Sequence, residues 1–203
     1  MSKILMVTAH PALEKSRNNI RILNAVNELG KVTVRDLYEL YPRFNINAKK
    51  EQQFLENCDV IVLQHPFYWY GTPALMKQYL DIVFTHGWAY GKNGGKLRGK
   101  ILLNSLTTSG TRESYSYDQH NRFPLASYLL PFNQLVHVCE MHYLPPYVLH
   151  ESGKTFASAS AKHARKFKVI LNALATDAVD IDKLKQLEYL NDFQTEDVPT
   201  LNL

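Results

Sequence analysis

The segment that follows the first apolar run of the chain has the side chains of an anion-binding site. The run over residues 3–9 ends at His10, and a helical pattern begins a few residues later. Three small hydrogen-bonding residues and one cation enter that helix, namely Ser16, Arg17, Asn18 and Asn19. The free N–H groups and positive dipole end of a helix attract an anion, and His10 can add a donor. These residue types fit a phosphate site, but an ordinary helix cap without a ligand uses the same ones.

Four aromatic rings follow the third apolar run in direct succession. Pro66 opens this loop, and the rings are Phe67, Tyr68, Trp69 and Tyr70. Four neighbouring rings cannot all enter one core from a short loop, so some must be exposed or must cover a ligand. A flat heteroaromatic ring is a natural guest for such a surface. A ring-rich interface with a second copy of the chain explains the same residues equally well.

A turn of small residues follows the fourth apolar run. It consists of Thr107, Thr108, Ser109 and Gly110. Small side chains let backbone N–H groups approach a ligand edge closely, where they can stabilise negative charge on a ring carbonyl and nitrogen. Because these residue types also form ordinary loops, the turn counts only in combination with the other two segments.

Apolar runs of strand length alternate with segments of helical period, which is the pattern of an α/β protein. Strands are predicted over residues 3–9, 31–37, 59–64, 100–106 and, interrupted by Pro145 and Pro146, 140–148. Helices are predicted over residues 18–29, 48–57, 73–84, 124–138 and 159–173, the third with Thr72 as N-cap and Pro73 in its first position. This order predicts a doubly wound sheet of five parallel strands with helices on both faces. Ligands of such sheets bind beyond the carboxyl ends of the strands, where the three segments lie.

Length and composition fit one globular domain. The chain has 203 residues, of which 45% are hydrophobic and 21% charged, and its net charge is +4. Residues 177–203 carry seven acidic and two basic side chains, a net charge of −5, which leaves +9 for residues 1–176. We therefore expect a ligand-binding domain over residues 1–176 and an acidic C-terminal tail over residues 177–203. The positive body suits phosphate-bearing small molecules, and without a base-reading motif nucleic acid is not an expected partner.

The cysteines, the histidines and the lengths of the apolar runs indicate the cellular compartment and the absence of a metal site. Cys58 and Cys139 match no metal-ligand or redox spacing and are typical of buried thiols in a reducing compartment. The histidines also lack metal-ligand spacing, so no metal site is predicted. No apolar stretch approaches the roughly 20 residues of a membrane-spanning helix. We expect a soluble, cytoplasmic protein.

Together the segments resemble the quinone oxidoreductase branch of the flavodoxin-like family. Within that branch they are most similar to the ancillary flavoproteins of glutathione-regulated potassium-efflux systems. The resemblance covers roughly residues 1–172 and rests on AHPALEKSRNN, LYPRFNIN, QHPFYWYGTPALMKQYLD, VFTHGWAYG, the TTSG turn and YLPPYVLH. It implies a flavodoxin-like fold, a flavin cofactor and a homodimer.

The resemblance also implies roles by position. The flavin phosphate and ribityl chain would lie at His10, Ser16, Arg17, Asn18 and Asn19. The isoalloxazine ring would pack on Pro66, Phe67, Tyr68 and Trp69, and its pyrimidine edge on Thr107, Thr108, Ser109 and Gly110. Ser109 departs from the family, which usually has glycine there. A substrate pocket would include Tyr70 and, contributed to the partner subunit, Tyr90.

The implied activity is NAD(P)H:quinone oxidoreduction in two steps. NADH or NADPH passes a hydride to FMN, with FAD as the alternative, and a quinone-type acceptor then takes the same place and receives the hydride. Tyr115 and His120 lie where related quinone reductases have a tyrosine and a histidine that assist this transfer, with the histidine spacing one residue shorter. Both side chains are suited to supplying a proton to the acceptor oxygen.

Two other functions stay open. One is a regulatory subunit of a membrane potassium-efflux transporter, held at the inner face of the membrane, with the basic last helix as a candidate docking surface. The other is a flavodoxin-like electron carrier. Such carriers usually present an acidic face to their partners, which the positive body disfavours.

Overall fold

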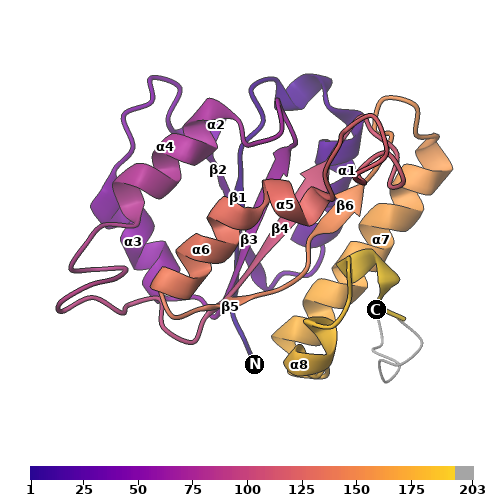
Figure 1. Ribbon diagram of the computed structural model, residues 1–203. Coiled ribbons are helices and arrows are strands. Elements are labelled where there is room, and N and C mark those ends of the chain that lie inside the picture. Colours follow the sequence, from indigo (N-terminus) through magenta and orange to yellow (C-terminus); the bar gives the residue numbers. More distant parts are fainter. Residues whose placement is uncertain (195–203) are drawn as a thin grey trace.

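The strands of the protein form one parallel sheet. The computed structural model describes residues 1–194, and Figure 1 shows the sheet at the centre of the molecule. The strand order is β2-β1-β3-β4-β5, and the short strand β6 also pairs directly with β4. The strands are β1 (Ile4–Thr8), β2 (Val32–Asp36), β3 (Val60–Pro66), β4 (Ile101–Thr107), β5 (His142–Tyr143) and β6 (Tyr147–Leu149). This arrangement confirms the predicted flavodoxin-like α/β fold.

The fifth strand position is divided in two, as the prolines in the sequence predicted. β5 pairs with Ile101 and Leu102 at the start of β4, whereas β6 pairs with residues 105–107 at its end. Pro145 and Pro146 lie between the two pieces and have no N–H group to donate to the ladder. The chain therefore leaves the sheet at the prolines and rejoins it beside the carboxyl end of β4.

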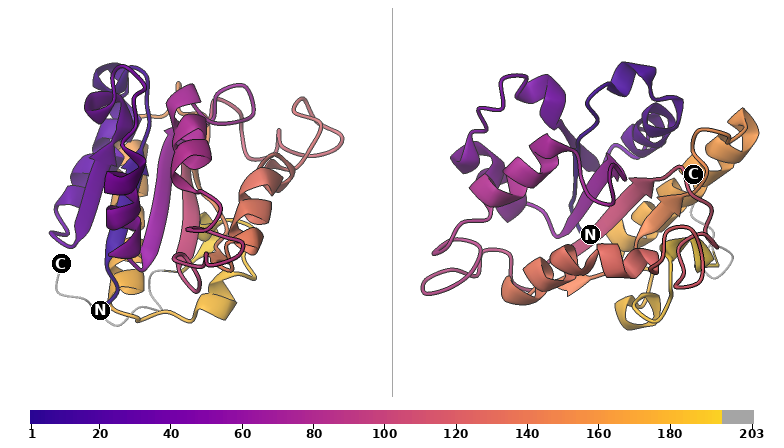
Figure 2. Two further views of the ribbon diagram at one scale, coloured as in Figure 1. Left: turned by 90° about the vertical axis from the view of Figure 1, so that its left-hand side faces the viewer. Right: turned by 45° about the horizontal axis from the view of Figure 1, so that its top comes forward.

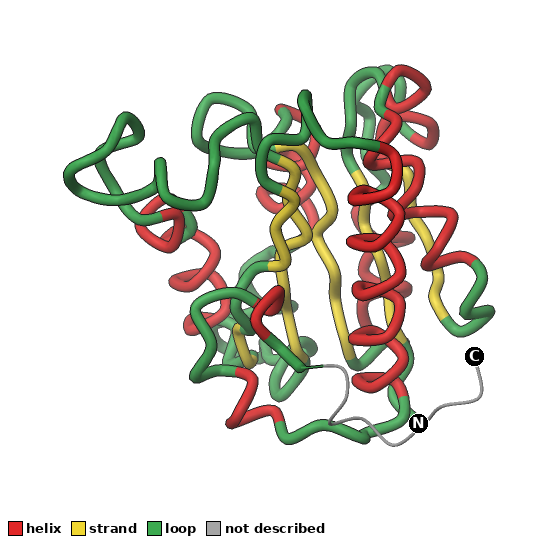
Figure 3. The backbone as a smooth tube through the Cα atoms, turned by 90° about the vertical axis from the view of Figure 1, so that its right-hand side faces the viewer, coloured by secondary structure: helices red, strands yellow, loops and turns green. Residues whose placement is uncertain are grey.

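Helices cover both faces of the sheet, as the two turned views in Figures 2 and 3 show. One face carries α1 (Arg17–Asn27) and α7 (Ala157–Ala175), and the other carries α3 (Ala48–Glu56), α4 (Ala74–Val83), α5 (Leu125–Tyr128) and α6 (Leu130–Val138). Side chains of β1 alternate between the two faces, since Leu5 and Val7 join the core under α3 and α4 while Ile4 and Met6 join the core under α1 and α7. Burial on both faces explains why the central strands are continuously apolar in sequence.

Two predicted helix boundaries were wrong in detail, and proline explains both. The α4 N-cap is Pro73 rather than Thr72, because Pro73 keeps an extended backbone with ψ 148° and the helix begins at Ala74. The helix predicted over residues 124–138 is two helices, α5 and α6, which meet at Leu129. Pro131 stands in the first turn of α6, where its missing N–H group is tolerated, but it cannot continue the hydrogen bonding of α5.

The chain after α7 returns to the body of the protein. It forms α8 (Ile181–Leu184) and the short 3₁₀ helix η2 (Leu190–Asp192), and the side chains of Leu184 and Leu190 join the core that α1 and α7 cover. The domain boundary at residue 177 stays a prediction, and residues 195–203 of the expected tail, including Glu196 and Asp197, lie outside the described residues. None of the helices within residues 1–194 has the length and apolar character required to cross a membrane.

Candidate functional site

A cavity of about 620 Å³ opens at the carboxyl edge of the sheet. Its walls come from the segments that follow β1, β3, β4 and β6. Ten of the residues predicted for a cofactor line it together, namely His10, Ser16, Arg17, Asn18, Asn19, Pro66, Phe67, Tyr68, Thr107 and Ser109. The three segments singled out in the sequence therefore meet at one place.

Buried polar side chains join the elements beneath this cavity. Thr8 at the end of β1 donates to the Gln64 side chain on β3, and the Gln64 amide donates to the Oδ1 atom of Asn19. The Asn19 amide in turn donates to Ser16 Oγ at 2.7 Å and to Thr107 Oγ1 at 3.3 Å. Because Thr8 and Gln64 are fully buried and Asn19 almost so, each of these bonds replaces water that the groups have lost. The network fixes the start of α1 against the ends of three strands.

The end of the cavity at α1 is suited to an anion. Lys15, Arg17 and Arg21 all line it, and none of the three forms a salt bridge within residues 1–194. Ser16 is the N-cap residue, but its side chain forms no capping bond to the first turn, whose N–H groups still need an acceptor. The positive end of the helix and three cations therefore converge where the sequence predicted a phosphate.

His10 is arranged as a neutral donor beside this end. Its Nδ1 atom accepts a hydrogen bond of 3.1 Å from the backbone N–H of Ala12. Burial lowers the pKa of His10 below its usual value. The neutral ring with Nδ1 as acceptor carries its proton on Nε2, which leaves Nε2–H available to donate.

The aromatic segment after β3 divides between the cavity and solvent. Phe67 and Tyr68 line the cavity, and the Tyr68 ring lies 6.0 Å from the His10 ring, edge to face. Trp69 is 95% exposed and does not line the cavity. Trp69 and Tyr70 have φ values of 47° and 61°, a left-handed backbone that ordinary residues seldom adopt. This sharp bend turns the segment outward after Tyr68.

The turn after β4 is held from both sides. The Thr108 N–H donates to the Leu149 carbonyl of β6 at 3.0 Å, and the Ser152 N–H donates to the Thr108 carbonyl at 2.8 Å. The Thr108 hydroxyl shares a short hydrogen bond with the Tyr115 hydroxyl. Burial raises the pKa of Tyr115, so the phenol keeps its proton at neutral pH.

Several predicted residues lie away from this cavity. Thr108, Gly110 and Tyr115 stand behind its wall, and His120 is exposed in the loop that follows. Tyr70 and Tyr90 line a second cavity of about 650 Å³ between α4 and α6, with Leu80, Phe84 and Leu135 among its apolar neighbours. The two residues predicted for a substrate pocket are therefore together, but in a separate hollow.

The cavity also includes residues that the sequence analysis did not single out. Ser152, Gly153 and Thr155 follow β6 and close one side, where the Asn18 amide donates to the Ser152 carbonyl at 2.6 Å. The rule that directed attention to the other strand ends applies equally to this one. Arg21 lies one helical turn after Arg17, and that i,i+4 spacing was the available signal for it.

Comparison with known proteins identifies the family to which this fold belongs. The chain matches the model of the flavodoxin-like fold over residues 2–171 and belongs to that family. The glutathione-regulated potassium-efflux system ancillary protein KefG of Shigella flexneri is 40% identical over 166 residues, which cover 82% of this chain and 91% of the relative. The resemblance inferred from the sequence motifs is thereby confirmed.

Two solved structures are similar throughout this chain's main body. The general stress protein 14 of Treponema denticola, solved in complex with FMN, has a TM-score of 0.79 and 32% identity, and the match covers 85% of this chain and 99% of that one. An NADPH-quinone reductase from P. pentosaceus has a TM-score of 0.77 and 26% identity, with coverage of 87% and 99%.

Gly110 tests how tightly the turn is packed. A Cβ atom there would lie 2.8 Å from Ser114 Oγ and 3.0 Å from both Asn121 Nδ2 and Tyr115 Cε2. We expect Gly110→Ala to lower the free energy of unfolding by about 1–3 kcal/mol, the usual cost of overpacking, in urea denaturation. Gly153→Ala is the control, since a Cβ there meets nothing within 4 Å. Equal stability of the two variants would show that the loop behind the turn adjusts freely.

Proposed function

We propose that the protein is a cytoplasmic, FMN-dependent NAD(P)H:quinone oxidoreductase that acts as a homodimer. The observation that carries the proposal is the cavity at the carboxyl edge, which joins a cationic helix start, two aromatic rings and a turn of small residues. The FMN-bound structure of the Treponema denticola protein and the quinone reductase from P. pentosaceus support it.

The residues of the cavity fit FMN. Its volume of about 620 Å³ falls within the roughly 300–1,000 Å³ of small-molecule sites. The start of α1, with Lys15, Arg17 and Arg21, would hold the phosphate, and the His10 Nε2–H group would add a donor. Phe67 and Tyr68 would contact the flat ring system, and Thr107 and Ser109 its polar edge. FAD stays the alternative.

FMN, when bound, supplies the ability to accept a hydride from NADH or NADPH and to return it to a quinone-type acceptor. The protein orients the reactants and stabilises charge. The N–H groups of Thr108 and Gly110 are already bonded, but the Ser109 N–H has no partner within residues 1–194 and can donate to an electronegative atom at the ring edge. The network of Gln64 and Asn19 holds that turn against α1. Because this donor is held in place before any ligand arrives, little reorganisation is needed during the reaction.

Tyr115 and His120 are the proposed proton donors to the acceptor. Tyr115 is protonated at neutral pH, and its hydroxyl is bonded to Thr108 within the wall of the cavity. His120 is exposed in the loop that Asn121 closes, where the Asn121 N–H donates to the Ser114 carbonyl at 3.1 Å. That position suits a residue that meets an acceptor entering from solvent.

A second copy of the chain would complete the acceptor pocket. The cavity between α4 and α6 is apolar, and it holds Tyr70 and Tyr90. Leu130 and Val138 on α6 are 60% and 44% exposed. Trp69, the residue before Tyr70, is exposed as well. An exposed surface of this composition is typical of an interface between subunits. In the proposed dimer Tyr90 contributes to the partner's substrate pocket.

Flavin binding is the first test. We expect the purified protein to be yellow, to release FMN on denaturation, and to oxidise NADH or NADPH with benzoquinone by ping-pong kinetics. Ser16→Glu should abolish flavin retention, because it sets a negative charge against the phosphate at the start of α1.

The matched control is Asn24→Glu, which adds the same charge at an exposed position farther along α1. It should retain FMN. A folded, colourless protein that binds neither FMN nor FAD would overturn the proposed function.

The proton donors are tested by conservative removal. We expect Tyr115→Phe and His120→Ala each to lower kcat by about 10²-fold, the lower range for general acid catalysis, with FMN still bound. Turnover should be followed in steady state with flavin content measured in the same samples. If His120→Ala turns over at the normal rate, His120 has no catalytic role, and the same outcome for Tyr115→Phe would leave that ring a packing residue.

A regulatory role beside a potassium-efflux transporter is a second candidate, favoured by the relatives named KefG at 40% identity. In this role the protein would bind the transporter at the inner face of the membrane, and redox activity would be secondary. We expect the protein to copurify with such a transporter and expect Ser16→Glu to alter potassium efflux in cells. Unchanged efflux after deletion of the gene would remove this role.

A further inference from the structure

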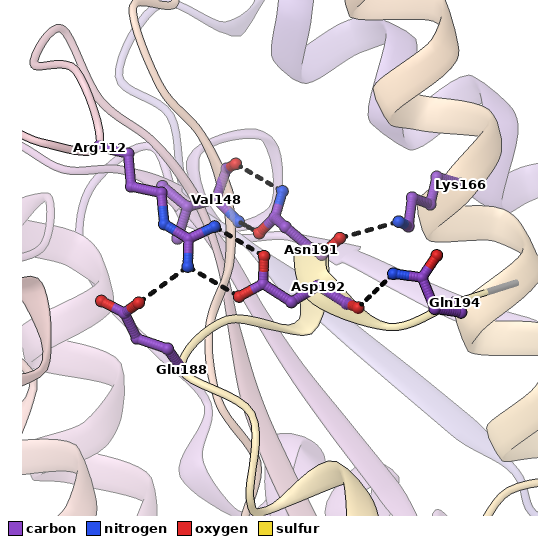
Figure 4. Close-up of polar contacts among 7 residues, drawn as sticks. All are labelled: Arg112, Val148, Lys166, Glu188, Asn191, Asp192 and Gln194. Carbon is purple, nitrogen blue, oxygen red and sulfur yellow. Dashed lines mark hydrogen bonds and ion pairs between the residues drawn. The ribbon is translucent and has the colours of Figure 1, made fainter.

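The segment Glu188–Asp192, which we call the C-terminal clamp, grips one arginine in the loop behind the cavity (Figure 4). Arg112 forms a bidentate pair with Asp192, with Nη1 to Oδ1 at 2.6 Å and Nη2 to Oδ2 at 2.8 Å. Its Nη2 atom also donates to Glu188 at 2.8 Å, and its guanidinium lies 4.4 Å from the centre of the Tyr189 ring. Paired bonds and a stacked ring fix both the position and the plane of the guanidinium.

The clamp is itself anchored on the edge of the sheet. The Asn191 side chain accepts from the Val148 N–H at 2.8 Å and donates to the Val148 carbonyl at 2.9 Å, as a neighbouring strand would. The Leu190 N–H donates to the Pro146 carbonyl at 3.0 Å, and Lys166 on α7 donates to the Asn191 carbonyl at 2.8 Å. Leu190 is fully buried. The carboxylate of Asp192 therefore projects from a rigid base.

Contacts lead from Arg112 to the wall of the cavity. The Tyr115 N–H donates to the Arg112 carbonyl at 3.2 Å, and the Tyr115 hydroxyl is bonded to Thr108. The His150 ring lies between two tyrosines, 6.1 Å from Tyr115 and 5.6 Å from Tyr189 of the clamp. Thr108 stands between Thr107 and Ser109, the two residues of the turn that line the cavity. Movement of Arg112 would thus reach the turn through Tyr115.

We propose that the C-terminal clamp positions the turn at residues 107–110 for the cofactor, with Arg112 and Asp192 as positioning residues. The clamp lies outside residues 2–171, the part that matches the flavodoxin-like family. The inference rests on the proposed flavin site. In this proposal the acidic segment Glu188–Asp192 supports the cofactor site.

The two acidic residues of the clamp differ in how firmly they hold Arg112. The Asp192 side chain is 34% exposed and meets both terminal nitrogens of Arg112, whereas Glu188 is 66% exposed and meets one. Solvent screens an exposed pair more strongly, and single contacts fix geometry less well than bidentate ones. Asp192 should therefore carry most of the positioning.

The experiment measures FMN binding by the full-length protein through quenching of flavin fluorescence. We expect Arg112→Ala and Asp192→Asn each to raise the Kd for FMN about 5- to 30-fold, the range of ordinary site-to-site coupling. Their double variant should be no weaker than the poorer single variant, because both changes break one interaction. Arg112→Lys, which keeps the charge but not the fork, should fall between the native protein and Arg112→Ala.

Two controls separate positioning from general loss of stability. Arg98→Ala removes an exposed pair with Glu140, 2.8 Å long and outside the residues that line the cavity, and should leave the Kd within twofold. Glu188→Gln should change it less than Asp192→Asn does. The visible absorption band of bound FMN should also change shape in Arg112→Ala, since the turn would contact the ring edge differently. An unaltered band and an unaltered Kd in folded Arg112→Ala would overturn the proposal.

Amide hydrogen exchange tests the effect of the clamp on the turn in protein without bound flavin. The N–H groups of Gly110, Tyr115 and Asn121 are all hydrogen bonded within or behind the turn. Asp192→Asn should speed their exchange about tenfold while the amides of β1 stay protected. If the native protein binds no flavin, the proposed function fails, yet faster exchange still supports the clamp as a support of the turn. Unchanged exchange at these amides would overturn the clamp.

Discussion

The common direction of the strands is the constraint on which the site depends. Parallel strands end at the same edge, so the segments after β1, β3, β4 and β6 meet there although they are far apart in sequence. Strand ends buried under α1 must also find partners for their polar groups. Thr8 and Gln64 bond to each other, and Gln64 also bonds to Asn19 on α1. These bonds fix the cationic start of α1 over the sheet. One set of buried bonds therefore closes the core and shapes the cavity.

The two sides of the cavity are held by different means. Near α1, buried amides and a hydroxyl on regular elements fix the site, and their burial makes each bond hard to break. Near β4, the turn belongs to a long loop and needs support from other segments. The β6 backbone provides part of that support, and the clamp with Asp192 provides the rest by holding Arg112. The proposed cofactor would contact a side fixed by buried hydrogen bonds near α1 and a side near β4 that depends on contacts from β6 and the clamp.

Much of the fold could be predicted because strong local patterns agree with it. The continuous apolar runs of β1, β3 and β4 require burial on both faces, and Pro145 and Pro146 announce the division of the fifth strand. Local pattern failed at Leu129, where helical periodicity continues across a break caused by the proline that follows. It also failed for Arg112, whose partners lie some 80 residues further along the chain. No periodicity links residues at that separation.

The sequence by itself determined the α/β class, the strand-end segments and the residue types that suit a phosphate and a flat ring. Those features depend on local spacing and on side-chain chemistry. Only the tertiary structure decided that Phe67 and Tyr68 face the cavity while Trp69 faces solvent, because a left-handed bend at Trp69 turns the chain. It alone separated Tyr70 and Tyr90 from the other site residues. It also brought Ser152 to the turn after β4 and Asp192 to Arg112 in the loop that follows. Such choices follow from packing between distant segments, which a pattern along one chain does not encode.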